Sequence, residues 1–212
     1  MIRIAGKKRQ RFVLRALCAI ALWTVCTMAA QPLSAQSKAS TFKDVADKPP
    51  AGWTLAGSKP ENYGAGIDGQ AVFEDKPSAY LKATVADTGG FGTLMQSFSA
   101  ERYLGKRIRL HAWVKTMNAS GWAGLWMRVD QGSVPISFDN MESRPIRNTT
   151  GWTSYDVVLD VPAGSTGIAF GLMLTGPGEV WMSGLKLETV GPEVAITGVP
   201  KPSGPVNLEF QK

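Results

Sequence analysis

The chain has almost none of the residues that build thiol or zinc centres. Its 212 residues include two cysteines, Cys18 and Cys26, and a single histidine, His111. Both cysteines lie in an N-terminal segment with the pattern of a removable signal, so the mature chain can form no disulfide. Zinc sites and cysteine nucleophiles are therefore excluded. Stability must come from a core that about 150 ordered residues can bury.

A net charge is also missing once the N-terminal segment is set aside. The whole chain carries 23 basic and 17 acidic residues, a net charge of +6, and its pI is near 9.4. Six basic residues and no acidic residue lie in 1–35, which leaves 17 residues of each sign. A neutral mature chain has no electrostatic footprint for a phosphate backbone or an anionic membrane. Neither nucleic acid nor, after cleavage, a membrane is therefore an expected partner.

No apolar run is long enough to favour a membrane anchor. The longest, Ala16–Ala30, has 15 residues, whereas a membrane-spanning helix needs about 20. It follows a basic stretch and precedes small residues that end at Ala35, which is the pattern of a cleaved secretory signal. The sequence therefore predicts a signal peptide over 1–35 and a periplasmic or secreted protein.

A sustained helical period is absent from residue 36 onward. Apolar and polar side chains alternate instead, in short segments separated by turn residues. This pattern favours an all-β fold, an antiparallel β-sandwich of the jelly-roll kind. The expected strands are 70–74, 78–84, 93–98, 107–115, 123–130, 152–161, 168–175 and 180–189, with 57–69 expected as a loop and 99–106 as either a helical turn or a corner.

Composition divides the chain into four parts. A flexible polar lead over 36–51 follows the signal peptide, and the predicted jelly-roll sandwich occupies 52–190. The remainder, 191–212, is rich in proline and glycine and is expected to be an extended tail.

Residues 123–130 are predicted to form a strand with one core face and one functional face. Apolar side chains alternate there with Trp126, Arg128 and Asp130. An indole beside hydrogen-bonding charged groups is typical of sites that bind sugars or small polar ligands. The alternative is that Trp126 covers a second apolar layer and that Arg128 and Asp130 form a structural ion pair.

A second strand, 107–115, has the same pattern and places His111 and Trp113 on its non-core face. If this strand lies beside 123–130, the two strands form one binding patch. Any Ser-His-Asp triad would have to use His111, but its place in an alternating strand favours a half-exposed strand residue over a catalytic base. No catalytic residue is assigned.

Further polar residues complete the candidate ligand site. Asp139, Asn140 and Arg144 could bind a ligand from the rim, although Asn140 could equally hold its own loop. Gln96 is either a buried amide or a groove contact. A structural Ca²⁺ near Asp68 is compatible with this architecture, but no ligand spacing requires one, so neither a metal site nor a cofactor is assigned.

Four segments resemble a bacterial galactose-binding-like domain, a jelly roll similar to carbohydrate-binding modules. They are 103–110 (YLGKRIRL), 125–130 (LWMRVD), 138–146 (FDNMESRPI) and 152–171. The resemblance covers about 52–190. It implies a jelly-roll fold, a general binding role, and relatives that occur alone after a signal peptide or as partner domains in bacterial transcription regulators. After Trp181 the resemblance favours an acidic residue two positions on, where this chain has Ser183.

The expected function is a non-catalytic, exported module that binds a carbohydrate or another small polar ligand. The alternative is an envelope domain that binds another protein or has a structural role. A weak glycoside hydrolase is a third hypothesis. It needs two carboxylates across a cleft, and Asp130 with Asp139 or Glu142 is the only crowded set.

Overall fold

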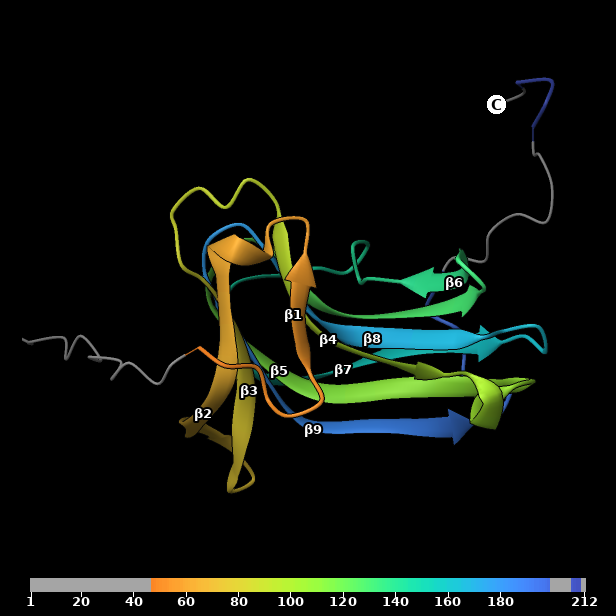
Figure 1. The fold of residues 1–212 in the computed structure, drawn as a ribbon, viewed down its shortest axis with the longest axis horizontal. Helices are drawn as coiled ribbons and strands as arrows, with labels where there is room; N and C mark the ends of the chain where they lie inside the picture. Colours follow the sequence, from red (N-terminus) through yellow and green to blue (C-terminus); the bar gives the residue numbers. More distant parts are fainter. Residues whose placement is uncertain (1–46, 199–206, 211–212) are drawn as a thin grey trace, which may run out of the picture. The chain divides into compact units, whose positions relative to one another are not determined.

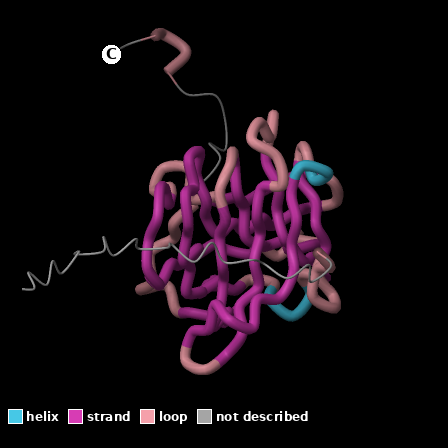
Figure 2. Tube along the Cα trace, turned by 90° about the vertical axis from the view of Figure 1, so that its left-hand side faces the viewer, coloured by secondary structure: helices cyan, strands magenta, loops and turns pink. Residues whose placement is uncertain are grey.

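The computed structural model describes residues 47–198 and 207–210. The predicted signal peptide and most of the predicted lead lie outside the described residues. Strands make up most of the described chain, with two short 3₁₀ turns (Figures 1 and 2). No helix among the described residues is long and apolar enough to cross a membrane. The elements are β1 Thr54–Gly57, η1 Pro60–Asn62, β2 Tyr63–Phe73, β3 Lys76–Ala83, β4 Phe91–Ser99, η2 Glu101–Tyr103, β5 Lys106–Gln131, β6 Val134–Asp139, β7 Ile146–Val161, β8 Gly167–Thr175 and β9 Glu179–Val190.

The nine strands form one continuous antiparallel sheet that curls over at β5, and its two halves are called the first and the second sheet below. The first sheet has the order β1-β4-β8-β5-β6 and uses the C-terminal half of β5. The second sheet has the order β7-β5-β9-β3-β2 and uses the N-terminal half. This arrangement confirms the predicted all-β antiparallel sandwich of the jelly-roll kind.

The core lies between the two sheets because apolar side chains recur at every second residue on the facing sides. In β5 the alternation continues through both halves of the strand. Fully buried side chains on the facing sides include Ile108, Leu110, Val114, Leu125, Met127, Val129, Leu94, Leu172, Leu174 and Leu81.

β5 changes sheets at a corner between Thr116 and Gly121. Its pairing with β7 shifts register three times between Val114 and Ala123, and Asn118 has a positive φ of 52°. Such irregularities bend a strand and increase its twist. The backbones pack so closely at this corner that a Cβ added at Gly121 would lie 2.1 Å from the carbonyl oxygen of Thr175. The corner therefore tolerates no side chain at Gly121.

The two predicted strands 107–115 and 123–130 are thus parts of one 26-residue strand. The prediction of a loop over 57–69 was also wrong, because β2 begins at Tyr63, whose side chain is buried. The glycines of this segment suggested a loop. In the structure, Gly66 lies in a strand and has no room for a side chain, because a Cβ there would lie 2.9 Å from the ring of Tyr80.

The corner at 99–106 contains a single 3₁₀ turn, η2. The Ser99 hydroxyl accepts a hydrogen bond from the Glu101 amide at 3.3 Å, and Gly105 ends the segment with a φ of +70°. Residues after β9 also contact the sandwich. Arg107 donates to the carbonyl of Val194, and the Thr197 amide donates to the carbonyl of Val158 at 3.0 Å.

Candidate functional site

The switch of β5 between sheets separates the residues that were predicted to form one patch. His111 and Trp113 lie on the outer face of the second sheet, where they pair with β7 and β9. Trp126 and Arg128 lie on the outer face of the first sheet, where β5 pairs with β8. The condition for a single patch is therefore not met, because the two segments are successive parts of one strand and not neighbours across a sheet.

The outer face of the first sheet is formed by three neighbouring strands, β4, β8 and β5, and is called the Trp126 face below. Their register aligns side chains in rows that run from an apolar end at Trp122 to a polar end at Asp130. These two residues are about 26 Å apart along the strand at about 3.3 Å per residue. The face consists of Phe91, Thr93, Met95 and Ser97 on β4, Ala169, Gly171 and Met173 on β8, and Trp122, Gly124, Trp126, Arg128 and Asp130 on β5.

Trp126 forms the floor of this face. Its side chain is only 6% exposed and belongs to an apolar cluster separate from the main core. The indole Nε1 donates to the Thr93 hydroxyl at 2.7 Å, and that hydroxyl donates to the Leu172 carbonyl at 2.9 Å. A Cβ at Gly171 would lie 3.0 Å from Nε1, so glycine leaves room for the indole. Trp126 therefore covers a second apolar layer, the alternative that the sequence left open.

Three half-buried apolar side chains pack on this floor and form the accessible part of the face: Phe91, Met95 and Trp122. Trp122 was missed by the sequence analysis, which began the strand at Ala123. The period of two gives the missing signal, because Trp122 lies four residues before Trp126 and therefore on the same side of the strand. Trp122, and not Trp126, is the indole that a ligand can reach.

Arg128 and Asp130 lie at the polar end of the Trp126 face. The Arg128 Nε donates to Asp130 Oδ2 at 3.1 Å and lies 2.9 Å from Oδ1. They line an open pocket of about 420 Å³. Its other lining residues are Met95, Ser97, Phe98, Ser99, Thr166, Gly167, Ile168 and Ala169.

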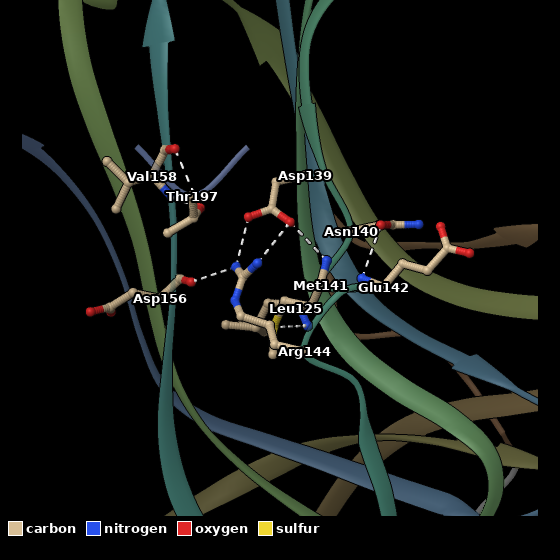
Figure 3. Close-up of polar contacts among 9 residues, drawn as sticks. All are labelled: Leu125, Asp139, Asn140, Met141, Glu142, Arg144, Asp156, Val158 and Thr197. Atoms are coloured by element: carbon tan, nitrogen blue, oxygen red, sulfur yellow. Dashed lines mark hydrogen bonds and ion pairs between the residues drawn. The ribbon is translucent and has the colours of Figure 1, made fainter. Parts of the chain in front are cut away.

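Asp139 and Arg144 form a buried ion pair away from this face (Figure 3). Arg144 donates both Nη groups to the Asp139 carboxylate, at 3.1 and 2.6 Å, and one Nη also donates to the carbonyl of Asp156. The Asp139 side chain is 6% exposed, and it also accepts the Met141 amide at 2.8 Å. These contacts attach the loop after β6 to β7, which is a structural role.

The pKa of Asp139 reflects this environment. Burial alone would raise the pKa of its carboxyl, but hydrogen bonds from Arg144, Thr197 and the Met141 amide, with the charge of Arg144, lower it below its usual value. Asp139 is therefore held as a carboxylate.

Neither Asn140 nor Gln96 lies on the Trp126 face. The Asn140 side-chain oxygen accepts the Glu142 amide at 3.1 Å, so the residue holds its own loop (Figure 3). Its side chain also lines a pocket of about 480 Å³ beside β6. Gln96 pairs with Phe170, a core residue, and so lies on the side of β4 opposite Thr93 and Met95.

On the outer face of the second sheet, His111 and Trp113 both have structural partners. The His111 Nδ1 lies 2.7 Å from an oxygen of Asp156 on β7. The ring of Trp113 stacks on Phe73 with centroids 4.5 Å apart, and Phe73 also contacts Trp152 at 5.5 Å. The β2–β3 hairpin thus covers Trp113.

A partly buried charged cluster occupies the other end of that face. The Asp47 carboxylate accepts the Tyr80 hydroxyl at 2.5 Å and contacts the Lys82 ammonium at 3.1 Å. Trp181 Nε1 donates to Asp68 at 3.0 Å, and Asp68 also accepts two backbone amides. No group of three or more metal-ligating side chains occurs within the described ranges.

Glu179 lies in this cluster and is 7% exposed. Burial raises the pKa of its carboxyl to about 7. The nearby charges of Asp68 and Asp47 add to this rise, whereas Lys82 and Lys115 oppose it.

The carboxylates considered for glycoside hydrolysis do not face one another. Asp139 pairs with Met127, a core-facing position, whereas Asp130 lies on the outer side of β5 with Arg128. Glu142 is exposed in the loop after β6. Because Asp130 and Asp139 lie on opposite sides of the sheet, they cannot act together across one cleft.

No known family model matches this sequence. One relative, the uncharacterized HTH-type transcriptional regulator YbfP of Bacillus subtilis (strain 168), is 46% identical over 172 residues. The match covers 78% of this chain and 58% of the regulator. The chain thus spans little more than half of that relative. The match confirms that similar sequences occur in bacterial transcription regulators.

Several solved structures match this chain at low sequence identity and with TM-scores below 0.5. The xylan-binding CBM22-1 domain of Paenibacillus barcinonensis Xyn10C has a TM-score of 0.48 and 11% identity, covering 68% of this chain and 90% of that chain. A cyclase, Fisc, from Fischerella sp. TAU has a TM-score of 0.47 and 16% identity, and the match covers 68% of this chain and 87% of the cyclase chain. These values are too low to transfer a ligand or a reaction.

We predict that Arg144→Ala lowers the free energy of unfolding by about 3–5 kcal/mol, because it leaves Asp139 buried without its counter-charge. Urea denaturation of the purified protein measures this loss. Asp139→Asn in the same chain should recover part of it. Lys59→Ala, which breaks the exposed pair with Glu61, is the control and should cost clearly less. Equal losses in the Arg144 and Lys59 variants would contradict a structural role for the Asp139–Arg144 pair.

We also predict that stability falls as the pH rises through the range in which Glu179 loses its proton. The pKa of Glu179 is about 7 in the folded chain against a usual value of 4.5, so the folded state holds more protons between these values. The stabilisation is complete below pH 4.5 and lost by about pH 7, an effect of about 3 kcal/mol. Unfolding curves at pH 5 and 8 should therefore differ in the natural protein, and the difference should shrink in Glu179→Gln but not in Glu142→Gln.

Proposed function

We propose that this protein is a non-catalytic module that binds a carbohydrate or another small polar ligand on the Trp126 face. The observation that carries the proposal is the order of side chains along that face. Half-buried Phe91 and Trp122 lie at one end, Met95 lies in the middle row with Trp126, and the hydrogen-bonding pair Arg128–Asp130 lies at the other end. A carbohydrate has both apolar C–H faces and hydroxyl edges, so it can use both ends at once.

The packing of the Trp126 face supports the proposal that its side chains are held in position before a ligand binds. Trp126 is fixed by its hydrogen bond to Thr93 and by the close fit over Gly171. Side chains that are already held in position lose little conformational entropy when a ligand arrives. A rigid floor beneath a partly exposed indole therefore favours small-ligand binding.

The opposite placement of Asp130 and Asp139 supports a non-catalytic role. The similarity to a transcription regulator is compatible with this proposal. A ligand-binding domain can form an exported protein by itself or can be one domain of a regulator. The second candidate is a protein-binding domain, because a partly exposed apolar cluster on a sheet face can also receive a protein side chain.

We further propose that the protein is exported. The support is the N-terminal pattern of a basic stretch, a 15-residue apolar run and small residues ending at Ala35. Cell fractionation followed by mass spectrometry should find the chain in the periplasm or the medium, beginning at Gln36. Recovery of the full-length chain from the cytoplasm would contradict export.

The binding role predicts that Trp122→Ala weakens ligand binding at least tenfold, because the mutation removes the accessible indole while the floor remains. A glycan array identifies ligands, and tryptophan fluorescence titration of the purified protein gives the affinity. Trp152→Ala, which removes a half-buried indole from the second sheet, is the matched control and should bind normally. A folded protein that binds no glycan would reject this proposal and favour the protein-binding alternative.

A further inference from the structure

Arg128 differs from the other ion-paired arginines of the sandwich in how it uses its guanidinium. Arg107, Arg109 and Arg144 each direct terminal Nη groups at a carboxylate or carbonyl. Within residues 47–198, Arg128 makes only one hydrogen bond, through Nε to Asp130. Its side chain is 42% exposed. Among the described residues, the Arg128 Nη groups therefore have no acceptor, and they lie at the edge of the pocket.

Asp130 provides an acceptor beside these donors. Its side chain is 16% exposed, but its Oδ1 atom is buried and has no well-aligned hydrogen bond although the Arg128 Nε lies 2.9 Å away. Among the ion-paired acids of the sandwich, Glu188 and Asp139 receive two or more hydrogen bonds from their arginines. Asp130 receives one, at Oδ2. A ligand donor would therefore have to reach Oδ2, which keeps capacity to accept a second hydrogen bond.

The pair thus presents free N–H donors on one side and a carboxylate acceptor on the other. A ligand with two adjacent hydroxyl groups satisfies both, because one hydroxyl oxygen accepts from an Arg128 Nη and the other hydroxyl donates to Asp130. A carboxylate ligand would be attracted to Arg128 but repelled by Asp130. Since no other residue that lines the pocket is charged, the balance between Arg128 and Asp130 alone decides how a charged ligand is received, whereas a neutral diol satisfies both residues.

The remaining lining suits the apolar side of such a ligand. Met95 and Ala169, on the outer face, contribute apolar atoms next to the pair. A pyranose or furanose ring has C–H groups that can rest on such a surface while its hydroxyls point to Arg128 and Asp130.

We propose that the pocket at Arg128 and Asp130 selects an uncharged sugar unit with two adjacent hydroxyl groups over the corresponding uronic acid. This inference rests on the proposed binding function. It makes Arg128 and Asp130 the specificity-determining residues of the Trp126 face. The charge of the ligand, as well as its shape, then decides binding.

The test uses matched oligosaccharides of neutral hexoses or pentoses, hexose oligomers oxidised at C6 to uronates, and analogues that lack one hydroxyl of the pair. Titration calorimetry of the purified protein measures each affinity. We expect a neutral oligosaccharide to bind at least tenfold more tightly than its uronate and its deoxy counterpart. Arg128→Gln and Arg128→Lys should each weaken binding of the neutral ligand at least tenfold, because both lose the forked donor.

The Asp130→Asn variant distinguishes loss of the negative charge from a general loss of folding. It removes the negative charge, so discrimination between the neutral ligand and the uronate should shrink several-fold even as neutral binding weakens. A loss caused by misfolding would not change the ratio in this direction. Arg109→Gln, on the outer face of the second sheet, is the matched control and should leave every affinity unchanged.

The outcomes separate this inference from the proposed function. Binding of a neutral glycan that is abolished by Trp122→Ala but unaffected by Arg128→Lys and Asp130→Asn would overturn the selection mechanism and leave the binding function intact. A uronate that binds as tightly as its neutral parent would do the same. A folded protein that binds no oligosaccharide would overturn both.

Discussion

The whole arrangement depends on the pairing of one long strand with neighbours in both sheets. β5 pairs with β7 and β9 through its N-terminal half and with β8 and β6 through its C-terminal half. A strand that serves two sheets must bend, and the irregular pairing between Thr116 and Gly121 provides the bend. Because side chains alternate on both halves, a single strand supplies core residues to both inner faces and exposed residues to both outer faces.

The two outer faces have different electrostatic character. On the second sheet, Arg107, Arg109 and His111 each have an acidic partner on a neighbouring strand. Most charges there are matched across strands, so that face offers few free groups to a ligand. On the first sheet, Arg128 and Asp130 are neighbours on the same strand and satisfy each other only in part. Unsatisfied donors and acceptors beside an apolar surface are what a small polar ligand requires.

Trp126 supports the outer face of the first sheet from below, because it is buried in an apolar cluster separate from the main core. A buried indole on the outside of a sheet needs a partner for its N–H, and Thr93 provides one. It also needs space above the neighbouring strand, and Gly171 provides that. The resulting flat layer supports Phe91 and Trp122 at the surface. Of the two indoles on this face, Trp126 is 6% exposed and Trp122 is half-buried, so Trp122 is the more accessible one.

The sequence by itself determined the fold class and the side of each strand on which a residue lies. Alternation with a period of two is a local property, so it placed Leu125 and Met127 in the core and Trp126 and Arg128 on the outer side. Only the tertiary structure decided which residues lie together on one outer face and which side chains are covered by others. The separation of Trp113 from Trp126, the burial of Asp139 by Arg144, and the covering of Trp126 all depend on strand pairings and loop contacts. No local pattern specifies such pairings, because their partners are chosen by packing of the whole sandwich.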